Sequence, residues 1–197
     1  MARPGLGPRT LADLVALAKQ KPGQITFGSG GAGSSAHLAM ELLLNVSGIT
    51  ALHVPFRGVA AAIAEVIAGR VDIVIASLAS GVAHVQAGTL AGLAVSGDKR
   101  SALLPETPTF IEAGQPRYDM SYWWGVAAPA GTPKPIVDRL HREIVTASGK
   151  PRLREAYLKQ AALAVTSTPQ EMTKHLECEI GLGARSSPAP RSRSNDL

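Results

Sequence analysis

The fold of this chain is decided by the stretch Ile25-Thr26-Phe27-Gly28-Ser29-Gly30-Gly31-Ala32-Gly33-Ser34-Ser35-Ala36-His37-Leu38. It places a glycine-rich turn between a short apolar strand and the start of an amphipathic helix. Glycine lets the backbone turn with its amide hydrogens directed outward, and these donors lie at the positive end of the helix dipole. The order strand, turn, helix therefore predicts an α/β fold with an anion site at the turn. We expect its donors to come from Ser29, Gly30, Gly33, Ser34 and Ser35.

Two kinds of anion fit the turn. The glycine spacing over residues 28–33 matches the dinucleotide pattern G-x-G-x-x-G, while Ser34 and Ser35 add hydroxyl donors suited to a small carboxylate. A dinucleotide site also needs an acidic residue about 20 positions further on, at the end of the next strand. The predicted strand over residues 52–56 has no acid and leads instead to Arg57. A carboxylate site, a dinucleotide site and a purely structural turn therefore all stay open from these residues.

The composition indicates a folded protein rather than a disordered one. The chain has 197 residues, of which 45% are hydrophobic and only 4% aromatic. This length allows one large or two small domains, and the abundance of small residues favours close packing of helices on a sheet. The single cysteine, Cys178, excludes an internal disulfide.

The charge and the N-terminal sequence argue against a nucleic-acid-binding, a membrane-spanning or a secreted protein. The net charge of +5 is scattered outside the basic C-terminal tail, with no basic run interleaved with aromatics, so we expect no nucleic-acid partner. No cofactor and no metal is expected either. No stretch reaches the roughly 20 apolar residues of a spanning helix, and residues 1–5 lack the apolar core of a signal peptide. Taken by itself, the sequence predicts a cytoplasmic protein.

Strands and helices alternate on both sides of the glycine turn. A capped helix begins after Thr10, and amphipathic helical segments separate apolar runs of strand length. These runs cover residues 24–27, 51–55, 71–76 and 90–95. The alternation predicts a parallel sheet with right-handed crossovers.

The carboxyl ends of these strands define the expected site, because ligands of such sheets bind beyond them. The residues that should join the glycine turn on this rim are Phe56, Arg57, Gly58, Ser77 and Ser80. His37 follows one turn into the helix, where it either touches the ligand or orients the loop. Arg57 either pairs with a carboxylate or is simply solvated. The two serines either line the rim or cap a helix.

The C-terminal part of the chain has a different pattern. Thr132 and Pro133 are expected to start a helix that continues to about Ala147, and Thr168 and Glu171 form the capping box of a last helix. The other expected elements are a short helix over residues 109–113, a strand over 121–128, a helix after Pro151 and a strand over 162–165. The last helix should end near residue 180, and residues 181–197 are expected to be a disordered tail.

A series of landmarks in fixed order carries a resemblance to a known family. They are Lys21-Pro22-Gly23, the glycine-serine turn with His37-Leu38, His53-Val54-Pro55-Phe56-Arg57-Gly58, Ala87-Gly88-Thr89-Leu90 with Leu93-Ala94-Val95, Leu104-Pro105-Glu106-Thr107-Pro108-Thr109 with Glu112-Ala113-Gly114, and Trp124-Gly125 with Ala128-Pro129-Ala130-Gly131-Thr132-Pro133. Over about residues 10–180 the chain resembles the Bug family, the TctC-like periplasmic solute receptors of tripartite tricarboxylate transporters. The resemblance implies a type II periplasmic-binding-protein-like α/β fold without enzyme activity or cofactor. It also implies a small carboxylated ligand and membrane transporter subunits as partners.

The resemblance further implies how the chain is divided. Family members have two α/β lobes that close on a solute, so residues 10–120 would form the complete second lobe and residues 121–180 the C-terminal part of the first. The opening part of the first lobe would be absent, as in a truncated copy, and the family's periplasmic location would lack its signal peptide here. This chain departs from many family members at two places on the rim, and both departures remove polar groups. Residues 76–80 lack the Asp-Asn pair of those members, and Phe56 replaces a frequent tyrosine. The alternative is a nucleotide-dependent oxidoreductase that uses the glycine turn.

Overall fold

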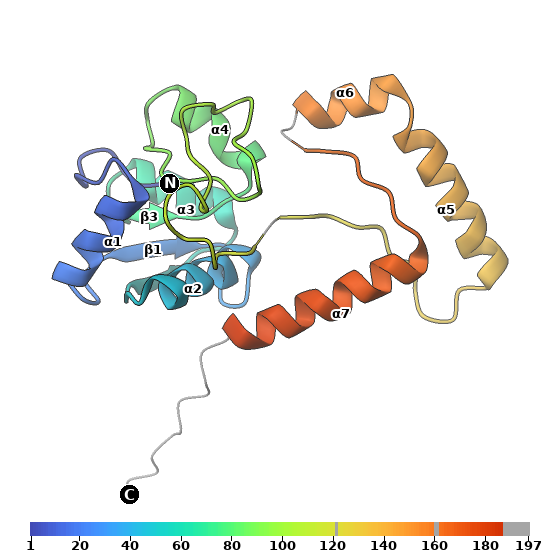
Figure 1. Ribbon diagram of the computed structural model, residues 1–197, viewed down its shortest axis with the longest axis horizontal. Helices are drawn as coiled ribbons and strands as arrows, with labels where there is room; N and C mark the ends of the chain where they lie inside the picture. Colours follow the sequence, from blue (N-terminus) through green and yellow to red (C-terminus); the bar gives the residue numbers. More distant parts are fainter. Residues whose placement is uncertain (121, 160–161, 187–197) are drawn as a thin grey trace, which may run out of the picture. The chain divides into compact units, whose positions relative to one another are not determined.

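The computed structural model describes residues 1–120, 122–159 and 162–186 (Figure 1). Contacts within the chain divide it into a first compact unit built on Met1–Ser121 and a second built on Tyr122–Leu182. The two units have different architectures.

The first unit is a parallel α/β unit. Its helices are α1 (Leu11–Gln20), α2 (Ser35–Ser47), α3 (Val59–Ile67) and α4 (Leu78–Gln86), and its strands are β1 (Thr26–Ser29), β2 (Leu52–Pro55) and β3 (Ile73–Val74). The strands form a sheet of order β2-β1-β3 in which both pairings are parallel. Because a helix follows each of the strands, the predicted fold class is confirmed.

Polar side chains set the starts of α1 and α2. At α1 the Asp13 amide donates to the Thr10 hydroxyl at 3.1 Å, and the Thr10 amide donates to the Asp13 carboxylate at 3.0 Å. At α2 the Ser34 hydroxyl accepts from the His37 amide at 3.3 Å. These bonds satisfy main-chain donors that have no partner inside the helix.

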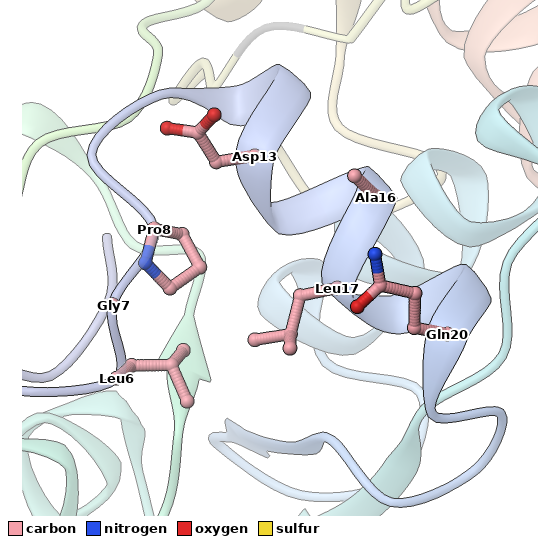
Figure 2. A pocket seen from close by; sticks show the side chains of 7 residues that line it. All are labelled: Leu6, Gly7, Pro8, Asp13, Ala16, Leu17 and Gln20. Atoms are coloured by element: carbon pink, nitrogen blue, oxygen red, sulfur yellow. The ribbon is translucent and has the colours of Figure 1, made fainter.

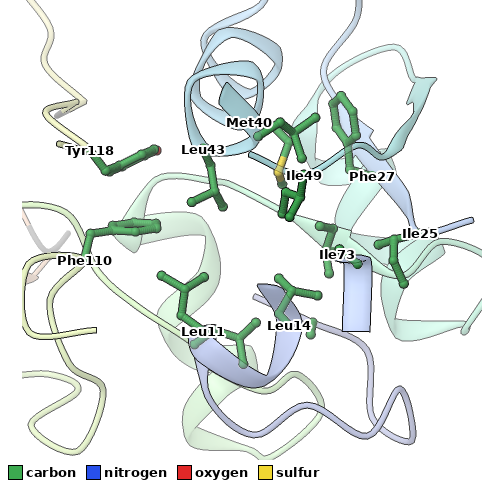
Figure 3. Packing of buried hydrophobic residues seen from close by; sticks show 14 residues of the cluster. Leu11, Leu14, Ile25, Phe27, Met40, Leu43, Ile49, Ile73, Phe110 and Tyr118 are labelled. Carbon is green, nitrogen blue, oxygen red and sulfur yellow. The ribbon is translucent and has the colours of Figure 1, made fainter. Parts of the chain in front are cut away.

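Side chains alternate between the two faces of the sheet, and each face has its own core. Phe27 and Ile73 belong to a cluster with residues of α1 and α2, as Figure 3 shows, whereas Val74 belongs to a cluster with residues of α3. Gly28 faces α3, where an added Cβ would lie 3.0 Å from the Cβ of Ala62. Glycine at this position therefore lets α3 pack close to β1. Helices cover both faces, as expected of a parallel sheet.

The edge of the sheet beyond β3 differs from the prediction. The run over residues 71–76 forms only the short β3, and residues 90–95 form no strand. Ala2 lies between them, because it makes antiparallel bridges to both Ile73 and Ala91 and exchanges two 2.9 Å main-chain hydrogen bonds with Ala91. Residues 1–3 thus occupy the place where the two predicted strands would have paired directly. Ala2 is fully buried, so residues 1–3 are part of the first unit.

Asp72 ties three segments of this unit together. Its carboxylate accepts from the Arg3 Nε at 2.8 Å and from both the amide and the hydroxyl of Thr26 at 2.9 Å. Burial alone would raise the pKa of Asp72, but the hydrogen bonds from Thr26 and Arg3 outweigh it and lower this pKa. The ionised carboxylate therefore holds the start of β1, the segment before β3 and the N-terminal residues together.

The second unit is helical in its described residues. It contains α5 (Lys134–Ser148), α6 (Pro151–Lys159) and α7 (Pro169–Ser186). The strands predicted over residues 121–128 and 162–165 do not form in the described part of these ranges. A strand needs a hydrogen-bonded partner strand, and the described residues of this unit supply none. The predicted helix over residues 109–113 of the first unit is likewise only a turn.

Two helix ends also differ from the prediction. The N-cap of α5 is Pro133 rather than Thr132, whose hydroxyl instead donates to the Pro129 carbonyl at 2.8 Å. The capping box of α7 forms as predicted, since the Thr168 amide donates to the Glu171 carboxylate at 2.7 Å and the Glu171 amide to the Thr168 hydroxyl at 3.2 Å. However, α7 continues through Gly181 and Gly183 to Ser186, since each glycine in a helix costs only about 1 kcal/mol. The rest of the predicted tail, residues 187–197, lies outside the described residues.

Candidate functional site

The candidate site is the edge of the sheet at which the three parallel strands end. There β1, β2 and β3 lead into the segments 30–34, 56–58 and 75–77, and each segment leads into the N-terminus of a helix. Helix N-termini carry partial positive charge. From Ser29 to Ala36, from Pro55 to Ala60 and from Ile75 to Gly81, Arg57 is the single charged side chain. The edge therefore has the electrostatic character that an anion needs.

The glycine turn and the segment after β2 lie against each other. The Phe56 amide donates to the Ser29 carbonyl at 3.1 Å, and the Gly58 amide donates to the Gly30 carbonyl at 3.4 Å. A Cβ added at Gly30 would lie 3.2 Å from the Val59 nitrogen, so a side chain there would push against the start of α3. Gly58 is the N-cap of α3 with φ of 100°, a conformation that favours glycine. No side chain of a described residue caps α3, so the amides of its first turn have no capping partner there.

The glycine turn uses several of its own donors. The Gly31 amide donates to the Ser29 hydroxyl at 3.1 Å, the Gly33 amide to His37 Nδ1 at 3.0 Å, and the Ser34 amide to the Gly31 carbonyl at 3.2 Å. The Gly33 and Ser34 amides therefore have partners within the turn and its helix. Ser29 is fully buried and supports the turn from within. Within the described residues, the amides of Gly30 and Ser35 have no such partner.

Two stacked histidines support this turn. The rings of His37, from α2, and His53, from β2, stack with their centroids 4.0 Å apart, and the ring of Phe27 lies 4.8 Å from that of His53. His53 Nε2 lies 2.6 Å from the Ser29 hydroxyl, and His37 Nε2 lies 3.4 Å from the Glu41 carboxylate. Burial, and secondarily the proximity of His37, lower the pKa of His53.

Sequence reasoning missed His53 and Glu41 as parts of this site. His53 lies in a family landmark, and Glu41 lies one helical turn after His37. The available signal was the pairing of neighbouring parallel strands, which places His53 opposite Phe27.

The lowered pKa of His53 gives a pH prediction. The unfolded chain binds a proton at His53 more readily than the folded chain. Folding stability is therefore fully present above the ordinary histidine pKa of 6.5 and is lost progressively as the pH falls below it. We expect the urea midpoint to fall between pH 6.5 and 5 more steeply for the native chain than for His53→Gln. Equal slopes in urea titrations of the two proteins would contradict this.

The remaining predicted residues divide by environment. Phe56 is half-buried and packs against the cluster beneath α3, so its side chain belongs to the core. Arg57 is exposed and forms no ion pair with a described residue. Ser35, in the first turn of α2, is exposed as well. The hydroxyls of Ser77 and Ser80 lie 2.8 Å apart at the start of α4. Ser77 is the N-cap residue of this helix, but its side chain makes no capping hydrogen bond with a described residue.

A separate pocket lies away from these residues. Figure 2 shows it between residues 6–8 and one face of α1, with a cavity volume of about 270 Å³. Its lining contains none of the predicted site residues, and its carboxylate, Asp13, is already bonded in the cap of α1. Among the described residues there is no group of three or more side chains able to hold a metal ion. Nor is any described helix both long and apolar enough to cross a membrane.

Comparisons with known proteins identify a family and similar chains. The family model described as "Tripartite tricarboxylate transporter family receptor" matches residues 1–181. A UPF0065 protein from the tcbD-tcbE intergenic region of a Pseudomonas species is 38% identical over 169 residues, which cover 85% of this chain and 50% of that protein.

Two solved structures share the fold. The structure described as R. palustris Rpa4515 with adipate is 31% identical with a TM-score of 0.86, over 94% of this chain and 62% of that one. The periplasmic binding protein BugD is 25% identical with a TM-score of 0.82, over 93% of this chain and 62% of that one. The chain thus spans about half the length of the curated relatives it matches.

Proposed function

Because the chain belongs to the family of tripartite tricarboxylate transporter receptors, we propose that it captures a small carboxylated metabolite for such a transporter. The partners in this proposal are the solute and the membrane subunits of the transporter, and the location is the periplasm, as for BugD. The protein binds and releases its ligand without chemical conversion.

The observation that carries the proposal is the arrangement at the carboxyl edge of the sheet. Three parallel strands bring three helix N-termini to one edge, where Arg57 is exposed and acidic side chains are absent from the adjoining segments. A carboxylate accepts hydrogen bonds from main-chain amides and from a guanidinium, and each bond to a charged group contributes about 1.5–3 kcal/mol. Rpa4515 was solved with adipate, a dicarboxylate.

The division of the chain into parts of two lobes belongs to the same proposal. In the first unit, buried residues form cores on both faces of the sheet. In the second unit, none of the described residues is buried, and Ile136, Leu140 and Ile144 of α5 are 51%, 49% and 39% exposed. These residues recur at the spacing of one helix face, as expected of a helix that packs against a further element. This supports the first unit as one complete lobe and the second as part of another.

The oxidoreductase alternative has less support. β2 ends at Pro55 and is followed by Phe56 and Arg57, so the acidic residue that binds the ribose of a dinucleotide is missing from its usual place.

Thermal unfolding in the presence of ligands tests the proposal. We expect adipate to raise the melting temperature, since a ligand at 100 times its Kd stabilises the folded state by about 2.7 kcal/mol. Its neutral diamide, which has the same carbon chain without the charges, should have no effect. Stabilisation by NADH but not by any di- or tricarboxylate would contradict the proposal and favour the oxidoreductase.

A further inference from the structure

The stacked histidines suggest a role that does not involve touching the ligand. We infer that His53 is a positioning residue, which holds the glycine turn in its binding conformation through the Ser29 hydroxyl, with His37 holding the other side of the turn. The inference rests on the proposed function, because the turn it positions belongs to the proposed carboxylate site.

The hydrogen bonds around the Ser29 hydroxyl determine the tautomer of His53. A hydroxyl has one hydrogen to donate and two lone pairs that accept. The Ser29 hydroxyl has three partners, namely the Gly31 amide at 3.1 Å, the Gly31 carbonyl at 3.1 Å and His53 Nε2 at 2.6 Å. All three are satisfied when Ser29 donates to the carbonyl and accepts from the amide and from a protonated Nε2. This arrangement assigns neutral His53 the tautomer with its hydrogen on Nε2.

His37 is oriented in a matching way. Its Nδ1 accepts from the Gly33 amide, so the hydrogen of the neutral ring is on Nε2, which faces the Glu41 carboxylate at 3.4 Å. A proton added at Nδ1 would remove the acceptor of the Gly33 amide. The rings stack nearly in parallel, with an interplanar angle of 11°, so a displacement of one ring affects the other. The titratable groups in contact here are His37 and Glu41 from α2 and His53 from β2.

The two contacts fix two glycines of the turn. Gly31 and Gly33 have φ of 121° and 75°, conformations that glycine adopts readily and that a flexible turn would exchange with others. Ser29 bonds both polar main-chain atoms of Gly31, and His37 bonds the amide of Gly33. The neighbouring donors at Gly30 and Ser35 are thereby held in one direction. A preorganised loop binds more tightly because less conformational entropy is lost on binding.

Two substitutions at His53 separate its hydrogen bond from its packing. His53→Phe keeps an aromatic ring against both Phe27 and His37 but removes Nε2. His53→Gln loses the ring but keeps a polar atom that can reach Ser29. His84→Gln, a change of the same type near the end of α4, is the matched control. Two properties of the whole chain are measured for each variant. NMR gives the amide signals of Gly31 and Gly33 without ligand, and calorimetry gives the affinity for adipate.

For His53→Phe we expect both glycine signals to shift and the adipate affinity to fall about tenfold. His53→Gln should recover most of the affinity, and His84→Gln should match the native chain. The inference is overturned if His53→Phe leaves the Gly31 signal and the affinity unchanged, or if His53→Gln loses as much affinity as His53→Phe.

Two further results distinguish a failure of the positioning role from a failure of the proposed function. If His53→Phe does not fold, Ser29→Ala removes the same link with the rings in place, and an unchanged Gly31 signal in that variant overturns the inference. If the native chain binds no carboxylate, the proposed function fails. The glycine signals without ligand then decide the positioning role by themselves.

Discussion

Replacing Asp72 by alanine is expected to lower the free energy of unfolding of the first unit by about 3 kcal/mol. The substitution removes three hydrogen bonds at once and leaves the Thr26 amide and the Arg3 guanidinium without their acceptor. Unpaired groups at this largely buried position cost more than the bonds themselves contribute. Urea unfolding followed by circular dichroism measures the loss.

The control for this prediction is Glu65→Ala. Glu65 pairs with Arg70 through two side-chain contacts, one of them 2.7 Å long, but this pair lies on the surface. Exposed ion pairs contribute little, so this variant should lose only a small fraction of what Asp72→Ala loses. Equal losses in the two variants would show that Asp72 does not tie the three segments together.

The second large effect is expected at Arg57. Reversing its charge in Arg57→Glu should weaken adipate binding about 100-fold, because a hydrogen-bonded cation is replaced by a group that repels the carboxylate. Since Arg57 is exposed and forms no ion pair with a described residue, the melting temperature should not change. Calorimetry gives the affinity and thermal unfolding gives the stability.

Arg117→Glu is the matched control for Arg57→Glu. Arg117 is exposed, belongs to the same unit and lies outside the segments that follow the strands. The Arg117→Glu variant has the same change in net charge as Arg57→Glu, so it measures only the long-range electrostatic effect on adipate binding. If both variants weaken adipate binding equally, Arg57 has no direct role in the site.

The parallel α/β core could be predicted from the sequence because its signals are local. The apolar runs around Phe27 and Val54, the caps at Thr10 and Ser34 and the glycine ends of helices all appear in the sequence at the required spacing. The pairing of Ala2 could not be predicted in this way. It depends on a contact across 89 residues with Ala91, and residues 1–3 have no periodicity that indicates a strand.

The candidate site could likewise be predicted from the sequence only in part. The meeting of the glycine turn with residues 56–58 follows from parallel topology, which sequence alternation predicts. The direction of each side chain does not follow. Ser29 and Phe56 point into the interior, and His53 becomes part of the site, because strand register and packing decide which side chains face inward. The strands predicted in the second unit failed for a related reason, since an apolar run becomes a strand only where a partner strand is present.

An adipate titration followed by the NMR signals of the main-chain amides tests most directly whether the strand ends bind a carboxylate. We expect saturable shifts of Gly30 and Ser35 and of Ala60 in the first turn of α3, with little change at Leu17 beside the separate pocket. Shifts confined to the residues of that pocket, or no shifts at the glycine turn while adipate binds, would contradict the assignment of the strand ends as the carboxylate site.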